Sequence, residues 1–303
     1  GLTIVNIFGV NVSKVVNNLI TISKLVPLAL FIAIGIFFIN GTNFTPVFPQ
    51  DTYIDGSFAQ AAVLLFFAYT GFEVIAIAAE DMKNPKKNLP RAIIMCMLIV
   101  SVLYMAILAV SIGVLGPDLA NTKAPVQDAF NVIVGPIGMY IVLAGTLISM
   151  GGINFAEAYY APRIATSMAE DGMLPSALAK RNRYNAPYVA AIVTAIASVL
   201  LAWSGSFTTL AAISAVSRFT QYLPTCLAVI IFRHKWADKE RSYTIPGGYT
   251  IPVLAIGTSL WMLWQAQTNQ LLWGLGGCIV ILPLYVWYWR KKKAGLIKEK
   301  EDI

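Results

Sequence analysis

Charged side chains are scarce in this sequence. Asp, Glu, Lys and Arg together make up 12% of the 303 residues, roughly half of their share in soluble domains. A soluble domain with so few charges could hardly cover its surface, whereas a helix that faces lipid needs no polar coat. Hydrophobic residues make up 57% in a count without glycine, above the roughly 45–50% of soluble domains. The composition therefore favours a protein embedded in a lipid bilayer.

Cysteine and histidine are also few. The three cysteines each lie inside an apolar stretch, and the single histidine, His234, lies in a charged segment. No spacing among them is typical of a disulfide framework or a metal site, so the sequence predicts no metal. The sequence also lacks a nucleophile–base pair and a phosphate-binding loop. We therefore expect a protein that is not an enzyme and needs no cofactor.

The net charge of +7 raises the question of nucleic-acid binding. The basic residues form short clusters between apolar stretches, and no helix-turn-helix or aromatic-basic RNA-binding motif is present. Basic clusters beside apolar stretches are typical of the cytoplasmic side of a membrane protein. We therefore expect this chain to have the lipid bilayer as its partner, and no nucleic acid.

Apolar stretches long enough to span a bilayer recur along the whole chain. A transmembrane helix needs about 20 mostly apolar residues. Eight candidate spans cover residues 15–39, 57–79, 92–115, 134–160, 188–203, 207–232, 249–267 and 271–289. Residues 1–9 resemble the end of an earlier helix, and the first residue is Gly rather than Met. We therefore expect further N-terminal helices of the same protein.

The connections between these spans carry Lys and Arg unequally. Nineteen of the 22 basic residues fall on one predicted side of the membrane, and Lys123 alone falls on the other. Lys24 and Arg218 lie inside spans. Because cytoplasmic loops carry an excess of Lys and Arg, we predict a multi-pass protein of the plasma membrane. Both ends of this chain are predicted to lie in the cytoplasm.

The second apolar stretch contains two residues that disturb a simple span. Gly71 lies near its middle, where glycine weakens a helix. Glu73 brings a carboxyl group to membrane depth, where ionisable groups usually mark a pathway. A transporter helix interrupted near the midplane exposes backbone carbonyls and amides, which suit the ammonium and carboxylate groups of an amino acid. The alternative is that Gly71 only permits close packing of helices.

A longer motif surrounds this segment. The sequence YTGFE at residues 69–73 is followed by EDMKNPKKNLPRAI at residues 80–93. Together they resemble the signature of the amino acid–polyamine–organocation permeases. Further segments are similar to parts of that family: TISKLVPL at 21–28, PR at 162–163 with MAEDGMLP at 168–175, and SRF at 217–219 with QYLP at 221–224. The resemblance covers the whole chain.

The resemblance implies an all-α membrane protein with the inverted-repeat, sodium-symporter-like transporter fold. Family members have two repeats of five helices followed by two accessory helices, and this chain matches helices five to twelve. We therefore expect one transporter domain over residues 1–303, with helices one to three and nearly all of helix four missing. Its expected parts are the fifth helix at 15–39, the second repeat at 57–232, the accessory helices at 249–289 and a cytoplasmic tail at 290–303.

The resemblance also implies a substrate site around the interrupted helix. The expected substrate-binding residues are Phe66, Phe67, Ala68, Tyr69, Gly71 and Phe72. Phe67 matches the aromatic residue that covers the substrate from outside and acts as a gate. Many relatives have Trp at that position, so Phe implies a less bulky lid.

Two ionisable residues match positions that serve coupling in the family. Lys24 matches a lysine that replaces a bound sodium ion in proton-coupled members; the alternative is a side chain that only extends to the cytoplasmic interface. Glu73 matches an acidic position after the helix break, and its alternative role is a polar contact that ties the unwound segment to its neighbours. Ser149 is a candidate neighbour of the Lys24 ammonium group. Arg218 is expected to be structural and to need a buried partner, for which Glu73 is a candidate.

These features predict secondary active transport of an amino acid, by symport with a proton as the coupling ion. An exchanger that moves an amino acid against its amine product is the alternative within transport. A non-transporting membrane sensor or a partner subunit is the alternative of another class. Such a protein would not need Lys24, Glu73 and the interruption at Gly71.

Overall fold

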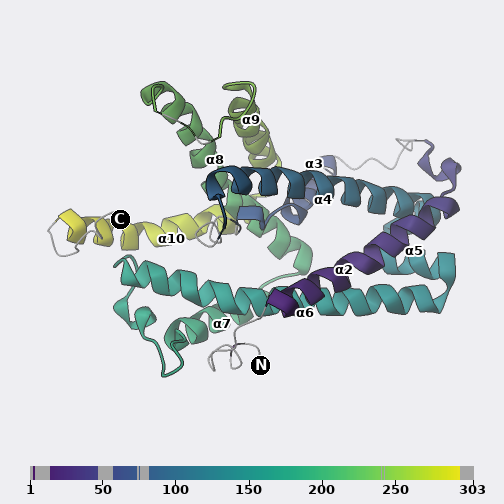
Figure 1. Ribbon diagram of the computed structural model, residues 1–303, viewed down its shortest axis with the longest axis horizontal. Helices are drawn as coiled ribbons and strands as arrows, with labels where there is room; N and C mark the ends of the chain where they lie inside the picture. Colours follow the sequence, from purple (N-terminus) through teal and green to yellow (C-terminus); the bar gives the residue numbers. More distant parts are fainter. Residues whose placement is uncertain are drawn as a thin grey trace. The chain divides into compact units, whose positions relative to one another are not determined.

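The computed structural model of the chain describes residues 3, 14–46, 57–73, 75, 82–239, 241 and 243–293. All regular secondary structure in these residues is helical (Figure 1), in agreement with the predicted all-α fold. Most of the predicted helix end at 1–9, the acidic pair Glu80 and Asp81, and residues 294–303 of the predicted tail lie outside the described residues.

The chain divides into two compact units, each assembled from segments far apart in sequence. Unit 1 comprises Gly1–Thr52, Val102–Leu201 and Tyr288–Ile303, and unit 2 comprises Tyr53–Ser101 and Ala202–Trp287. The long helix α4 (Pro85–Leu115) contributes its first part to unit 2 and its second part to unit 1.

Unit 1 is built mainly from α2 (Lys14–Gly35), α5 (Pro125–Val134), α6 (Pro136–Glu170) and α7 (Tyr188–Trp203). Its short 3-10 helices are η1 (Ile36–Phe38), η2 (Gly41–Phe44), η4 (Gly116–Asn121) and η5 (Ser176–Ala179). The buried rings of Phe31 and Phe130 meet edge to face with centroids 5.7 Å apart, and Val110 of α4 packs in the same cluster. This arrangement is a favourable one for aromatic pairs, so it fixes α2 against α5.

Unit 2 is built mainly from α3 (Ser57–Ala68), α8 (Phe207–Lys235), α9 (Thr250–Gln265) and α10 (Thr268–Lys293). Helix α8 begins at a typical N-cap, because the Ser206 side chain accepts a hydrogen bond from the backbone N–H of Thr209. Buried Val63 of α3 packs against Ala212 and Ala215 of α8. Small residues on α8 therefore let α3 approach it closely.

Each of the eight predicted spans contains a helix in the described part of the chain. Among the described residues, four helical stretches are long and apolar enough to cross a membrane, namely Ile20–Phe38, Pro85–Asn121, Pro136–Glu170 and Phe207–Lys235. Two shorter apolar helices are Ser57–Ala68 and Tyr188–Trp203. Helix α3 is short because the chain leaves the helix just before Gly71.

Helices α4 and α6 extend well beyond the predicted spans, further than α8 and α10 do. Helix α4 begins at Pro85 rather than at residue 92, and α6 ends at Glu170 rather than at residue 160. Charged residues end an apolar stretch, but Lys, Arg and Glu are good helix formers, so the helices continue. The short α5 helix was not predicted; Gly135, with a φ of 74°, separates it from α6.

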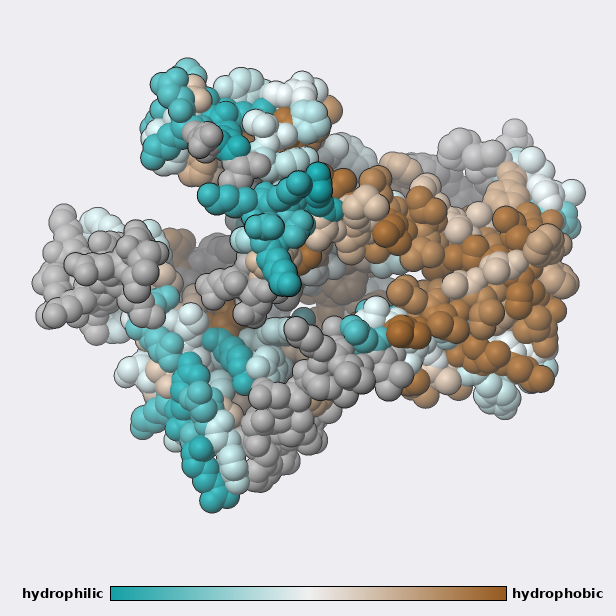
Figure 2. Space-filling model, viewed as in Figure 1, coloured by the Kyte–Doolittle hydropathy of each residue, from teal (hydrophilic) through white to brown (hydrophobic). Residues whose placement is uncertain are grey.

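Large apolar side chains lie exposed on unit 1. Phe37 is 85% exposed, and Ile137, Tyr140 and Leu147 of α6 are also exposed. Figure 2 shows an apolar surface, coloured brown, over α2 and the neighbouring helices of this unit. Exposed apolar surface of this extent is typical of an interaction site with a membrane or another protein, and it agrees with lipid-facing helices.

Candidate functional site

The chain leaves the α-helical path directly after Ala68, the last residue of α3. The backbone N–H groups of Tyr69 and Thr70 donate to the carbonyls of Phe66 and Phe67, at 3.0 Å each, which tightens the last turn. Gly71 then adopts a φ of 106°, which residues other than glycine rarely adopt. The predicted interruption therefore lies at Gly71, where glycine is needed for the turn itself.

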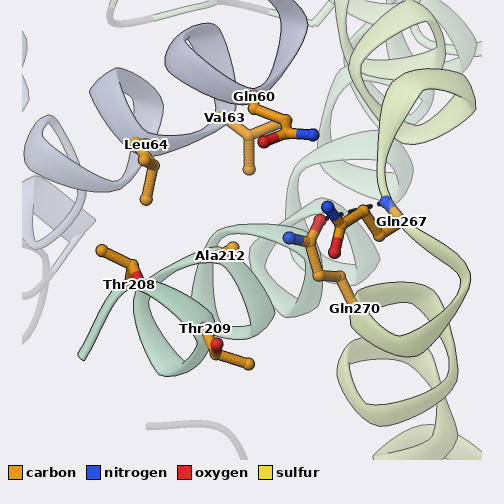
Figure 3. A pocket seen from close by; sticks show the side chains of 8 residues that line it. All are labelled: Gln60, Val63, Leu64, Thr208, Thr209, Ala212, Gln267 and Gln270. Atoms are coloured by element: carbon orange, nitrogen blue, oxygen red, sulfur yellow. Dashed lines mark hydrogen bonds between the residues drawn. The ribbon is translucent and has the colours of Figure 1, made fainter. Parts of the chain in front are cut away.

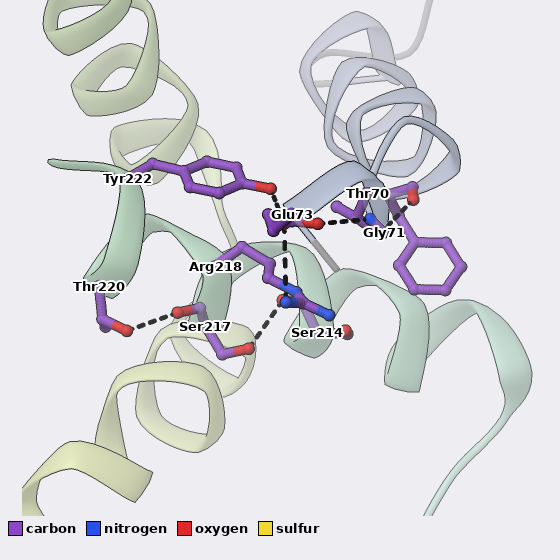
Figure 4. A network of polar contacts seen from close by, with 9 residues as sticks. Thr70, Gly71, Glu73, Ser214, Ser217, Arg218, Thr220 and Tyr222 are labelled. Atoms are coloured by element: carbon purple, nitrogen blue, oxygen red, sulfur yellow. Dashed lines mark hydrogen bonds and ion pairs between the residues drawn. The ribbon is translucent and has the colours of Figure 1, made fainter. Parts of the chain in front are cut away.

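The Glu73 carboxylate occupies the centre of a polar network at this break (Figure 4). The backbone N–H of Gly71 donates to Glu73 Oε2 at 2.7 Å. The hydroxyl of Tyr222 donates to Glu73 Oε1, and the Arg218 guanidinium lies 3.6 Å from the same oxygen. The Glu73 side chain is only 11% exposed, so its charge is balanced by these three partners rather than by bulk water.

Glu73 was one candidate partner for Arg218 in the sequence, and the structure places their charged groups 3.6 Å apart. Tyr222 was not singled out. Its position gave a signal, because residues four apart lie on the same face of a helix, and Tyr222 follows Arg218 by four on α8. A polar aromatic residue one turn beyond a charged residue in an apolar helix is a candidate partner for the same carboxylate.

Aromatic rings pack against the ring of Tyr222. The Phe66 ring stacks on Phe219 with centroids 4.7 Å apart and meets the Tyr222 ring edge to face at 5.8 Å. The Phe72 ring tilts against Tyr222 at 6.0 Å. The structure thus brings the predicted residues Phe66 and Phe72 together with Glu73, around a tyrosine that was not predicted.

The other predicted substrate residues lie on the same short segment but have different surroundings. Phe67 contacts Phe207 at the start of α8, with centroids 6.3 Å apart. Ala68 is exposed, and Tyr69 is half-buried. The Thr70 hydroxyl donates to the Phe67 carbonyl at 2.7 Å, and this carbonyl also accepts the backbone N–H of Thr70.

Lys24 and Ser149 lie in unit 1, on the interface between α2 and α6. A methyl group added at Gly145 would lie 2.6 Å from Cγ of Pro27, and one added at Gly152 would lie 2.5 Å from Cγ2 of Ile20. These two close approaches make the helices antiparallel neighbours. Lys24 falls between Ile20 and Pro27, and Ser149 falls between the two glycines.

This register brings Lys24 and Ser149 to the same level of the α2–α6 interface. Both side chains are half-buried. No hydrogen bond joins these two described side chains.

A cavity of unit 2 lies between α3, α8 and the start of α10 (Figure 3). It has a volume of about 150 Å³ and is lined by Gln60, Val63, Leu64, Thr208, Thr209, Ala212, Gln267 and Gln270. The backbone N–H of Gln267 donates to the Gln270 side chain at 3.1 Å. Because no charged group lines it, this cavity suits the ammonium and carboxylate groups of an amino acid less well than the network around Glu73.

Comparison with known proteins agrees with the predicted resemblance. A sequence model of the amino acid permease family matches residues 1–287. The branched-chain amino acid permease of Bacillus subtilis is 31% identical over 294 residues, which cover 93% of this chain and 61% of that protein. The methylthioribose transporter of Bacillus subtilis is 29% identical over 258 residues, which cover 85% and 55%.

The serine/threonine exchanger of Bacillus subtilis is 28% identical over 298 residues, which cover 96% of this chain and 68% of that protein. The chain spans only 61% and 55% of the length of the branched-chain permease and the methylthioribose transporter. Because the family model matches nearly the whole of it, this chain belongs to the amino acid permease family.

Proposed function

We propose that the protein carries an amino acid across the plasma membrane by secondary transport, coupled to the movement of a proton. The observation that carries this proposal is the Glu73 carboxylate, which holds the backbone N–H of Gly71 at the break after α3. An ionisable group inside a membrane protein is by default a functional candidate. Here it binds the same backbone group that a substrate carboxylate would need.

Membership of the amino acid permease family supports an amino acid as the substrate class. Two of the relatives are named for amino acids and one for methylthioribose. Fold-level likeness does not fix the substrate, so the proposal rests on the charged and polar groups near the break. The amides and carbonyls freed at a helix break suit a zwitterion.

The geometry suggests how a proton and a substrate could bind together. An ionised Glu73 accepts hydrogen bonds from Gly71 and Tyr222 and pairs with Arg218. A proton on Glu73 removes the negative charge, and a neutral acceptor makes a weaker hydrogen bond than an ionised one. The Gly71 N–H then becomes available to a substrate carboxylate. Arg218, no longer balanced by Glu73, would favour the same negative charge.

Lys24 is the second group proposed to take part in coupling. Lys24 is half-buried, and it lies on α2 between Ile20 and Pro27, which pack closely against α6. A fixed positive charge at that depth can replace a bound sodium ion, because it supplies the same charge to the surrounding dipoles. Sodium would then not be required, which leaves the proton as the proposed coupling ion.

Uptake by proteoliposomes tests the proposed function. The full-length protein is purified and reconstituted, and a panel of labelled amino acids, with methylthioribose as a further candidate, is supplied outside. We expect saturable uptake of at least one amino acid, absent from protein-free liposomes. Uptake of none of them would contradict the proposal. Saturable binding without uptake would instead favour a sensor.

Exchange is the second candidate mode, because the chain is 28% identical over 96% of its length to a serine/threonine exchanger. Liposomes preloaded with unlabelled amino acid, or with the corresponding amine, distinguish the two modes. An exchanger takes up label only when it is preloaded. A symporter takes up label into empty liposomes when a proton gradient is imposed.

A further inference from the structure

A cavity rich in basic residues lies at the end of α8 in unit 2. It has a volume of about 360 Å³ and is lined by Val229, Phe232, Arg233, Trp236, Lys239, Arg241, Tyr243, Thr244 and Ile245. The lining comes from the last turns of α8 and from the segment that follows it. Figure 2 shows hydrophilic residues, coloured teal, gathered over this end of the helix.

Three cationic side chains of this cavity are held in place by backbone and aromatic groups. Arg233 Nη2 donates to the Ile245 carbonyl at 3.0 Å. Arg241 Nη2 donates to the Trp236 carbonyl at 3.1 Å, near the end of α8. The Lys239 ammonium group lies 5.4 Å from the centre of the Trp236 ring. These contacts orient the cations through carbonyl and aromatic groups, which carry no net charge.

Each guanidinium group has five N–H donors, so Arg233 and Arg241 keep donors for a further partner. No carboxylate of the described residues forms an ion pair with either arginine or with Lys239. Asp238 does not line the cavity, and Glu240 lies outside the described residues. Guanidinium and ammonium groups gathered in this way fit the oxygens of a phosphate group.

One wall of the cavity is apolar. Val229, Phe232 and Ile245 line it, and the rings of Phe232 and Trp236 stack with centroids 4.7 Å apart. Tryptophan beside basic residues at the end of an apolar helix is typical of the membrane interface. The distribution of Lys and Arg predicts that this end of α8 faces the cytoplasm. A ligand with both a phosphate group and acyl chains matches the two kinds of lining.

We propose that this cavity binds the phosphate of an anionic phospholipid in the leaflet at the end of α8, with Arg233, Lys239 and Arg241 as its cationic partners. Basic pockets near the cytoplasmic ends of transmembrane helices are suited to anionic headgroups, and each Lys or Arg near such a surface contributes about 1 kcal/mol. The apolar wall would receive the glycerol and the first part of the acyl chains. A free phosphate ion would leave this wall unused.

The test counts bound lipid by native mass spectrometry. The protein, purified in a zwitterionic detergent, is titrated with short-chain phosphatidylglycerol, short-chain phosphatidylcholine or inorganic phosphate. We expect one saturable phosphatidylglycerol site, with much weaker binding of phosphatidylcholine. Lys239→Gln should weaken that site about five-fold, in line with the loss of one cation near the headgroup, and Arg233→Gln by a similar factor.

Lys235→Gln is the matched control, because Lys235 is an exposed cation of the same helix end that does not line the cavity. Its affinity for phosphatidylglycerol should stay close to that of the unchanged protein. Thermal unfolding without lipid checks that each variant is folded. Equal binding of phosphatidylcholine, or equal weakening by Lys235→Gln, would overturn the proposal. Binding of phosphatidylglycerol no tighter than that of inorganic phosphate would also overturn the proposal.

Discussion

The hydroxyl of Tyr222 donates a hydrogen bond to the carboxylate of Glu73, and so joins α8 to the segment that follows the end of α3. The same carboxylate accepts from the backbone N–H of Gly71 and pairs with Arg218. The break in α3 is therefore stabilised from α8 by two side chains one turn apart.

Replacing Tyr222 by Phe tests this contact. Tyr222→Phe keeps the ring that packs against Phe66 and Phe72 and removes only the donor. A hydrogen bond to a charged group contributes about 1.5–3 kcal/mol, so we expect a lower midpoint of thermal unfolding in detergent. Tyr285→Phe, on an exposed tyrosine of α10, is the control. Equal effects of the two substitutions would show that the Tyr222 hydroxyl has no special role.

Replacing Glu73 by Gln tests the proposed step of proton binding. Glutamine keeps the shape of the side chain and imitates a protonated, neutral Glu73. In the unchanged protein we expect substrate to bind more tightly as the pH falls, because a proton on Glu73 frees the Gly71 N–H. In Glu73→Gln we expect binding that no longer depends on this proton. Affinities measured by titration at two pH values check this; an unchanged pH dependence in the variant would contradict the mechanism.

At Gly71 there is space for a side chain, but the backbone conformation is one that other residues rarely adopt. A Cβ atom added there would have no heavy atom within 4 Å, yet the φ of 106° is rarely adopted by other residues. Backbone strain of this kind costs about 1–3 kcal/mol, so Gly71→Ala should lower the thermal unfolding midpoint and reduce transport. Gly257→Ala, in open space on α9 with ordinary helical backbone, should have no such effect. A Gly71→Ala protein as stable and active as the Gly257→Ala control would rule out a need for this conformation.

The approach of α2 to α6 depends on Gly145. A Cβ atom there would lie 2.6 Å from Cγ of Pro27 and 3.2 Å from the Ser23 carbonyl oxygen, and neither neighbour is the end of a flexible side chain. Overpacking costs about 1–3 kcal/mol, so Gly145→Ala should destabilise the protein to thermal unfolding. Gly151 of the same helix has open space around it, and Gly151→Ala should not destabilise the protein, because alanine favours a helix more than glycine does. The reverse order of the two midpoints would contradict the described packing.

Much of the fold could be predicted from the sequence because long apolar stretches leave few alternatives to helices in a bilayer. The break at Gly71 and the pairing of Glu73 with Arg218 were also predictable, since charged groups inside apolar helices need partners. The contact of Glu73 with Tyr222 was harder to predict from the sequence. An aromatic residue in an apolar helix usually only packs, and its hydroxyl gains a role from a segment about 150 residues earlier in the chain.

Other features depend on how the connecting segments fold. Helix α5 covers residues that the sequence assigned to the connection between the spans at 92–115 and 134–160. It is short, and the turn at Gly135 separates it from α6. The basic cavity at the end of α8 forms because the segment around Ile245 returns to Arg233. Neither the apolar pattern nor the spacing of the basic residues contains that information.

The most direct test of the account is uptake driven by an imposed pH gradient in sodium-free proteoliposomes. The proposed coupling requires that the unchanged protein accumulate labelled amino acid when the outside is more acidic, and that Lys24→Ala lose this accumulation while it still binds substrate. Ser149→Ala, at the same level of the α2–α6 interface, should have the smaller effect. Strict dependence on sodium, or full gradient-driven accumulation by Lys24→Ala, would contradict the account.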